Sequence, residues 1–287
     1  MPHLSEPPPS WYADPIWLSG GASFELDGQF SMARGSIKGI GALFTPPGAL
    51  HIGWNREPNW NALDQSGFPC VILDLPPGMT CEGDSSWSIQ QRHTRQLHWN
   101  LEDGDPVDQL PNHRLKQIRK GDRNGLRLEL TDDAERILEL HQAARQRKNL
   151  NSNVSVTRAQ LEKILESPHQ TAGVVLDQND RDVASAVFLH EKGRTIYAFG
   201  GQRRSKESAW ASVILIAAGL RSAYQRGNTC FDFGGSMDPG VDQFYAEFGA
   251  QPVPKLRCIR IARWARPWLR LTRPDLFDSN SSSRQHP

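Results

Sequence analysis

The sequence is poor in the features that mark secreted, membrane-spanning and nucleic-acid-coating proteins. Its four cysteines, Cys70, Cys81, Cys230 and Cys258, form no CxxC pair, so we interpret them as reduced, mostly buried thiols. The longest apolar run, Val213 to Leu220, is far shorter than the roughly 20 residues that a membrane span needs. A formal net charge of +1 gives no overall attraction to nucleic acid or to a membrane surface.

Targeting signals and several common catalytic motifs are also missing. The N-terminal stretch MPHLSEPPPSWY has neither a basic n-region nor an apolar h-region, so we expect no secretory signal and a cytoplasmic location. The sequence contains no GxSxG motif, no Cys–His signature, and no His, Cys and acidic residues at metal-ligand spacing. We therefore expect no metal cofactor and no serine- or cysteine-nucleophile chemistry.

The composition is that of a folded, globular protein. A chain of 287 residues, 38% hydrophobic and 23% charged, is long enough for one large domain or two small ones. Residues 11–104 predict short strands divided by Gly and Pro turns. The expected strands are 22–26, 40–44, 71–75, 87–91 and 96–101. The tryptophans of this part have two interpretations, core packing and the lining of a substrate cleft; they are Trp11, Trp17, Trp54, Trp60, Trp87 and Trp99.

Residues 105–123 predict a basic amphipathic linking helix, because Leu110, Leu115 and Ile118 recur at helical spacing. Basic residues surround this apolar stripe: His113, Arg114, Lys116, Arg119, Lys120 and Arg123. Two interpretations stay open for these charges. They form a solvated face, or they form a patch that meets the phosphates of a cofactor or of RNA.

From residue 124 onward the patterns become regular. Capping boxes at Asp132/Glu135 and Thr157/Gln160 predict two helices. The expected order is a strand (125–130), these two helices, three strands (171–177, 182–190, 194–199), a helix (210–226), a strand (229–233), a helix (240–248) and a strand (255–262). Short turns make the three middle strands antiparallel neighbours. The helical crossover predicts that 194–199 and 229–233 pair in parallel, which gives an α/β fold with a mixed sheet.

Three segments near the end of this order carry a family resemblance. They are Phe231–Gly235 (FDFGG), Gly240–Phe244 (GVDQF) and Phe248–Pro252 (FGAQP). With the element order of residues 124–263, they resemble the GNAT acyltransferase superfamily, and within it the Fem-type peptidyltransferases and the BioF2-like acetyltransferases. The resemblance implies a degenerate GNAT-like domain at 11–104, a linking helix at 105–123 and a GNAT acyltransferase domain at 124–270. The segment 271–287 is expected to be a disordered tail.

The chain departs from the Fem-type pattern at two places. The lysine expected after Phe244 is Tyr245, which weakens the aminoacyl-tRNA interpretation. Tyr245 followed by Gly249 instead resembles the YxxxGF end of ordinary GNAT acetyltransferases, where the tyrosine acts as general acid near the thioester sulfur. The loop Gln202–Ala209 has basic residues but lacks the inner glycines of the family's phosphate-binding signature.

The resemblance also implies a set of donor-binding residues. A strand amide is expected to bind the tetrahedral oxyanion, and we place it among the amides of Tyr197, Ala198 and Phe199. The strand end at Gly200 and the basic loop beyond it would bind the phosphates of acyl-CoA. The loop residues expected in that role are Arg203, Arg204, Lys206 and Ser208. The alternative for the two arginines is a solvated loop.

Two residues are candidates for catalysis. Tyr245 would protonate the leaving thiolate, and Asp232 would orient or deprotonate the amine, with Asp242 or Glu247 behind it. In the alternative interpretation, Tyr245 is a core residue and Asp232 caps the turn at Gly234.

The expected function is therefore an N-acyltransferase that moves an acyl group from acetyl-CoA or another acyl-CoA to an amine. The acceptor class is a small molecule, an amino sugar or a peptide. Two alternatives remain, an aminoacyl-tRNA-dependent transferase of Fem type and a non-catalytic double-GNAT scaffold that binds a partner.

Overall fold

The computed structural model describes residues 8, 10–18, 22–26, 30–53, 58–150, 153–205, 208–235 and 238–278. The chain forms two compact units. The first unit comprises residues 1–9, 95–234 and 240–251, and the second comprises 10–94, 235–239 and 252–287. Two strands, β5 (Trp87–His98) and β11 (Gln251–Ile261), run from one unit into the other.

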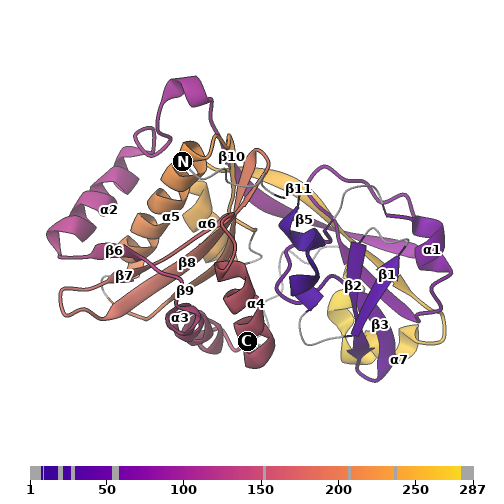
Figure 1. The fold of residues 1–287 in the computed structure, drawn as a ribbon. Helices are drawn as coiled ribbons and strands as arrows, with labels where there is room; N and C mark the ends of the chain where they lie inside the picture. Colours follow the sequence, from indigo (N-terminus) through magenta and orange to yellow (C-terminus); the bar gives the residue numbers. More distant parts are fainter. Residues whose placement is uncertain are drawn as a thin grey trace. The chain divides into compact units, whose positions relative to one another are not determined.

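The first unit is built on a mixed sheet with the strand order β5-β10-β9-β8-β7-β6 (Figure 1). Its further strands are β6 (Arg127–Leu130), β7 (Gln170–Leu176), β8 (Asp182–Glu191), β9 (Arg194–Gln202) and β10 (Cys230–Asp232). Strands β6 to β9 are antiparallel neighbours; short turns join β7 to β8 and β8 to β9, whereas α3 and α4 connect β6 to β7. Strands β9 and β10 are parallel, with Phe231 beside Thr195, so the predicted parallel pair is confirmed.

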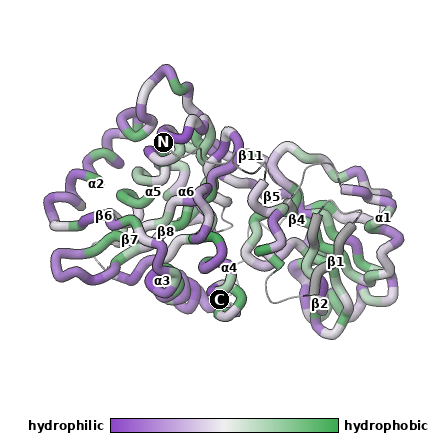
Figure 2. The backbone as a smooth tube through the Cα atoms, viewed as in Figure 1, coloured by the Kyte–Doolittle hydropathy of each residue, from purple (hydrophilic) through white to green (hydrophobic). Residues whose placement is uncertain are grey.

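Helices cover both faces of this sheet (Figure 1). One face carries α5 (Ser208–Gln225), α2 (Asn112–Arg123) and α6 (Pro239–Ala246), and the other carries α3 (Ala134–Arg147) and α4 (Val154–Leu165). Figure 2 shows hydrophobic segments along α5 and β8, whereas α2 is mostly hydrophilic. The exposed basic residues of α2 therefore lie outside the core, as expected for an amphipathic helix.

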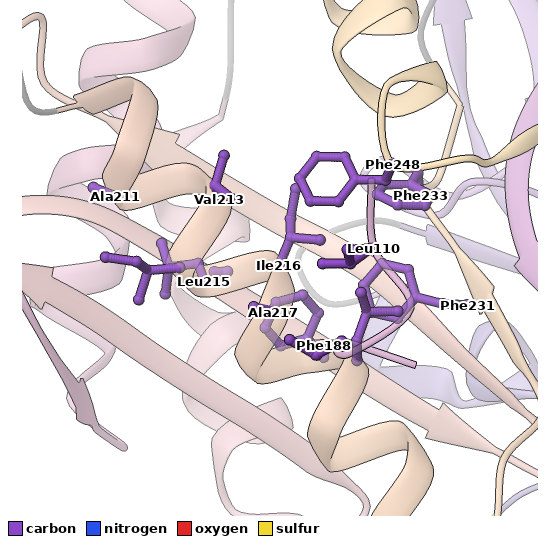
Figure 3. Packing of buried hydrophobic residues seen from close by; sticks show 14 of the residues in the cluster. Leu110, Phe188, Ala211, Val213, Leu215, Ile216, Ala217, Phe231, Phe233 and Phe248 are labelled. Atoms are coloured by element: carbon purple, nitrogen blue, oxygen red, sulfur yellow. The ribbon is translucent and has the colours of Figure 1, made fainter. Parts of the chain in front are cut away.

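The core of the first unit lies between α5 and the central strands. In Figure 3, Ile216 and Ala217 of α5 lie beside Phe188 and Phe231 of the sheet. Their side chains are 1% exposed or less. Burying each large apolar side chain contributes about 1.5–3 kcal/mol, so this contact fixes α5 on the sheet and with it the loop that enters α5.

The two long helices on the other face begin at caps that differ from the predicted ones. Asp133, not Asp132, caps α3, and its carboxylate accepts the amides of Glu135 and Arg136. Asn153, not Thr157, caps α4. Asn and Asp are at least as good N-caps as Thr, so α4 begins four residues before the predicted box, whereas α3 begins one residue after it.

The second unit has the strand order β1-β2-β3-β4-β11. Its elements are β1 (Ala22–Leu26), β2 (Phe30–Ile37), β3 (Ile40–Phe44), β4 (Cys70–Asp74), α1 (Trp60–Asp64) and α7 (Arg266–Thr272). Short 3-10 helices complete the chain: η1 (Trp11–Ala13), η2 (Pro15–Leu18), η3 (Leu101–Asp103) and η4 (Pro274–Leu276). Strand β2 was not predicted, and β3 pairs in parallel with β4.

Two expectations for this part of the chain are corrected. In place of the expected strands 87–91 and 96–101 there is one strand, β5, which ends at His98. Polar residues continue the strand because they have a place in the sheet: Arg92 pairs with Asp74, and Thr94 is buried. The ordered chain also extends past residue 271, since Leu271 lies in α7 and Leu276 is buried; residues 279–287 lie outside the described part.

The tryptophans support the core-packing interpretation. Those with at most 8% exposure are Trp11, Trp17, Trp60, Trp87 and Trp99. Trp60 and Trp87 meet edge to face with ring centroids 5.1 Å apart. Trp54 lies outside the described residues. No helix in the described part of the chain has the length and apolarity to cross a membrane.

Candidate active site

Strand β9 contains a β-bulge at Ala198. Tyr197 pairs with Phe188 of β8, and Phe199 pairs with Val187, so Ala198 is an additional residue that no β8 residue opposes in this register. Bulges of this kind interrupt the ladder and re-aim the side chains on either side. The bulge falls on the three residues whose amides were predicted to stabilise an oxyanion.

The additional residue reverses the side-chain alternation of β9. Before it, Tyr197 packs against Phe188 on the α5 face, with ring centroids 5.5 Å apart. After it, Phe199 meets His141 of α3 on the opposite face, also at 5.5 Å. In a regular strand, residues 197 and 199 point to the same face. The bulge thus places functional side chains on both sides of one short stretch.

The pairing of β9 with its parallel neighbour ends at the same place. The last pair is Asp232 with Ile196, and β9 then continues to Gln202. Beyond β10, the amide of Phe233 donates to the carbonyl of Arg95 on β5, at 2.9 Å. The continuation of β10 therefore stays with β5. The ladder between β9 and β10 therefore ends beside the bulge.

Two tyrosines flank this position. The ring of Tyr197 lies over Gly200, where an added Cβ would come within 1.8 Å of the phenol oxygen, so a larger residue at position 200 would have to displace that ring. Burial raises the pKa of Tyr197 to about 12. The half-buried ring of Tyr245 on α6 packs against Phe233 at 4.8 Å and meets Tyr197 edge-on at 6.3 Å.

An ion pair fixes the start of α6, the helix that carries Tyr245. Arg95 at the end of β5 donates from Nε and Nη2 to the two carboxylate oxygens of Asp242, at 2.8 and 2.6 Å. Its Nη1 also donates to the carbonyl of Ala250, at 3.3 Å. A bidentate arginine–carboxylate pair is strong and directional, so it sets the orientation of α6.

A second arginine fixes the other end of α6. Arg114 of α2 is 1% exposed, and its guanidinium lies between the rings of Phe244 and Phe248, 4.4 and 4.3 Å from their centroids. It donates to the carbonyl of Phe244 at 2.7 Å and pairs with Glu247 at 2.9 Å. Asp242 and Glu247, expected behind Asp232, are thus engaged in holding α6.

Asp232 lies at the end of β10 and is 4% exposed. Its carboxylate accepts the amide of Gly234 and the side-chain amide of Gln96, each at 2.9 Å. Arg194, which also pairs with the buried Glu191, lies 3.6 Å away. Asp232 therefore caps the turn at Gly234, as in the alternative interpretation, and is linked to a positive charge one strand away.

The predicted phosphate loop leaves β9 at Arg203. The Arg203 guanidinium donates to Glu139 of α3 at 2.5 Å and to the carbonyl of Asp182 at 3.1 Å. It lines a cavity of about 650 Å³ together with Arg136, Asp180, Arg181 and Asp182. Arg204 is exposed. Lys206 lies outside the described residues, and of Ser208 only its place as the first residue of α5 is described.

Sequence reasoning passed over His141. Its Nδ1 lies 3.1 Å from the carbonyl oxygen of Gly200, next to the bulge. Donation of the Nδ1 proton to that carbonyl leaves Nε2 as the proton acceptor. Burial lowers the pKa of His141, which favours the neutral ring. A single histidine on an apolar helix face gives no sequence signal, because only the sheet beneath it supplies the functional context.

The first unit combines a mixed sheet with a bulged strand beside a short parallel neighbour. Residues 112–246 match the family model of the acetyltransferase (GNAT) domain, so this segment is a GNAT domain. The resemblance drawn from the sequence motifs is confirmed at this level.

Solved structures of similar fold cover nearly the whole chain. FemX has 13% identity and a TM-score of 0.60 and covers 91% of this chain and 92% of its own. L-PGS from Bacillus licheniformis has 13% identity and a TM-score of 0.60, covering 91% and 90%. A C-terminal domain of a putative lysylphosphatidylglycerol synthetase from Agrobacterium fabrum has 12% identity and a TM-score of 0.56, covering 94% and 96%. At these identities the likeness concerns the fold. No curated protein matches the sequence.

Proposed function

We propose that this protein is an N-acyltransferase that transfers an acyl group from acyl-CoA to an amine. The observation that carries the proposal is the bulge at Ala198, placed where the pairing of β9 with β10 ends and where Tyr245 packs beside Tyr197. A thioester seated along β9 would meet the strand amides at the bulge on one side and a phenol on the other. The GNAT domain over residues 112–246 supports the reaction class.

The proposed reaction uses the residues in the following roles. An amide among residues 197–199 stabilises the oxyanion that forms when the amine attacks the thioester carbonyl. As the C–S bond breaks, the phenol of Tyr245 gives its proton to the leaving thiolate. The amide at Gly200 and the loop side chains of Arg203, Arg204 and Lys206, with the first amides of α5 at Ser208, bind the phosphates.

Two groups are candidates for receiving the proton of the amine. The Asp232 carboxylate interacts with Gly234, Gln96 and Arg194, and these contacts favour a role in orienting the end of β10. His141 is neutral and oriented by the carbonyl of Gly200. The variants His141→Gln and Asp232→Asn distinguish the two candidates. The pH profile of kcat/KM falls at low pH because the general base becomes protonated, so only the variant that lacks the base should lose this fall.

Binding of acetyl-CoA tests the proposal directly. Calorimetry and thermal shift with the full chain should show saturable binding, and a ligand at 100 times its Kd raises the unfolding free energy by about 2.7 kcal/mol. Arg204→Ala should weaken binding, whereas Arg119→Ala on the exposed face of α2 should not. Absence of any response at millimolar acetyl-CoA would contradict the proposal.

The aminoacyl-tRNA alternative has one supporting observation of its own. The exposed face of α2 carries Lys116, Arg119, Lys120 and Arg123. The fold likeness to FemX and to synthetases named for lysylphosphatidylglycerol is compatible with aminoacyl transfer. Under this alternative, charged tRNA binds at low salt with an affinity that falls steeply with ionic strength, and reversing two of these charges weakens it. A chain that binds neither acyl-CoA nor charged tRNA would support the scaffold interpretation.

A further inference from the structure

The second unit contains a pair of thiols that the proposed acyl transfer does not use. Cys258 lies on β11 with 0% exposure, inside a cluster formed by Val71, Leu73 and Trp87 among others. Cys81, from the segment that precedes β5, packs against the same cluster and is half-buried. The two side chains share a hydrogen bond, in which the Cys258 thiol donates to the Cys81 sulfur.

The surroundings favour a thiolate at Cys81 and a thiol at Cys258. Besides Cys258, the backbone at Gly83 is hydrogen-bonded to the Cys81 sulfur, and together these bonds lower the pKa of Cys81 to about 7 against the opposing effects of burial and Asp64. The same hydrogen bond, with burial, raises the pKa of Cys258. Cys70 and Cys230 differ, since burial raises their pKa to about 11 and about 12.

We propose that Cys81 is a peroxide-reactive thiol and that Cys258 resolves its oxidised form into a disulfide within the second unit. The proposal stands on the hydrogen-bonded pairing of a half-buried thiol with a fully buried one. The oxidant is a hydroperoxide, which is small enough to reach a half-buried sulfur. This site is independent of the proposed acyltransferase activity.

The chemistry balances in two steps. The Cys81 thiolate attacks one peroxide oxygen, the O–O bond breaks, and the alkoxide or hydroxide that leaves takes a proton from water, so sulfur is oxidised by two electrons and the peroxide is reduced. The Cys258 sulfur then attacks the sulfenic sulfur, and the S–OH oxygen leaves as water with the Cys258 proton. By then the negative charge on Cys81 that disfavoured ionisation of Cys258 is gone.

Oxidation of the full chain with hydrogen peroxide tests the disulfide. Titration should show loss of two of the four thiols, the intact mass should fall by two hydrogen atoms, and peptide mapping should join Cys81 to Cys258. Cys258→Ser should stop at a dimedone-reactive sulfenic acid on Cys81, and Cys70→Ser should behave as wild type. Retention of all four thiols, or a bridge to another cysteine, would overturn the proposal.

Alkylation tests the pairing in the reduced protein, where no bridge has to form. The rate of Cys81 alkylation should reach half its maximum near pH 7 in the wild type. Cys258→Ala removes the hydrogen-bond donor and should move this midpoint toward the ordinary thiol value of about 8.5. Cys258→Ser keeps a donor and should leave the midpoint low. Equal midpoints in the wild type and Cys258→Ala, both with native circular dichroism, would overturn the proposed pairing.

Discussion

Two tyrosines at the end of the β9–β10 pairing have different surroundings. Tyr197 is enclosed against Phe188 and over Gly200, and its raised pKa keeps the phenol protonated. Tyr245 stands on a short helix that two arginines hold in place. A catalytic acid must be held in position and must release its proton; burial makes release harder for Tyr197, so Tyr245 is the better candidate.

Tyr245→Phe should lower kcat for acyl transfer by roughly 10²- to 10⁴-fold, the usual contribution of a general acid, and leave acyl-CoA binding nearly unchanged. The aromatic contacts with Phe233 persist in this variant, so the melting temperature should change little. Steady-state kinetics and calorimetry check both statements. Tyr224→Phe, at the end of α5, is the matched control and should retain full activity; equal kcat in the two variants would exclude Tyr245 as the acid.

The roles of these side chains could be predicted only in part from the sequence. The sequence singled out Tyr245 and Asp232 through family motifs; Asp232 ends β10, and Tyr245 lies on α6 with its ring packed against Phe233. It did not indicate His141, nor that Asp242 and Glu247 pair with Arg95 and Arg114, because partners more than 100 residues apart meet only in the folded chain.

At the scale of elements, α3 lies directly on the end of β9. A Cβ added at Gly201 would come within 2.3 Å of the backbone of Leu140. Backbone atoms cannot move aside as a flexible side chain would. The contact therefore fixes the distance between the helix that carries His141 and the bulged strand.

Gly201→Ala should destabilise the protein by about 1–3 kcal/mol, the usual cost of overpacking a tight contact. Urea denaturation measures this loss as a shift in midpoint. Gly41→Ala is the control, since a Cβ there meets its nearest neighbour, Pro69, at 3.8 Å. A Gly201→Ala variant as stable as Gly41→Ala would show that α3 does not press on β9.

Removing the buried arginine of α2 should loosen α6. Arg114→Ala removes a guanidinium enclosed by two rings and its bond to the Phe244 carbonyl, and we expect a loss of about 2–4 kcal/mol in unfolding free energy. Glu247→Gln should cost less than about 1 kcal/mol, because Glu247 is 41% exposed. Denaturant titration of both variants tests the difference, and similar losses would contradict this assignment.

The order of elements in the first unit was largely predictable, whereas the bulge was not. Period-2 and period-3.6 patterns with Gly and Pro boundaries indicated the three antiparallel strands, α5 and the parallel pair. A bulge needs only one residue more than its partner strand has, and Ala198 carries no signal of it. The charged residues inside β5 likewise concealed a continuous strand, since their partners lie elsewhere in the chain.

At the scale of the whole molecule, stability should depend on acid through a buried histidine network. His190 is 1% exposed, with Thr171 at 2.9 Å from Nε2 and Thr195 at 2.9 Å from Nδ1. Burial, with the charge of Arg226, lowers the pKa of His190 from 6.5 to about 3. The unfolded chain therefore binds the proton first, so stability is complete above pH 6.5 and falls as the pH drops toward 3.

Between pH 7 and pH 5, His190 alone should remove about 2 kcal/mol of unfolding free energy. His141 and His169, whose pKa values are also lowered by burial, act in the same direction. Urea titrations at the two pH values measure the loss. His190→Asn should be less stable at pH 7 but should lose less on acidification; an equal loss in both proteins would assign the effect to other groups.

The bulge at Ala198 depends on a single additional residue in β9. Deleting that single alanine would join Tyr197 directly to Phe199, and the two side chains would still point to opposite faces, now by regular alternation. Gly200 and Gly201 would keep their faces as well, so the deletion would remove only the interruption of the β8–β9 ladder. Deleting a regularly paired residue of the same strand would instead turn every side chain beyond it to the other face.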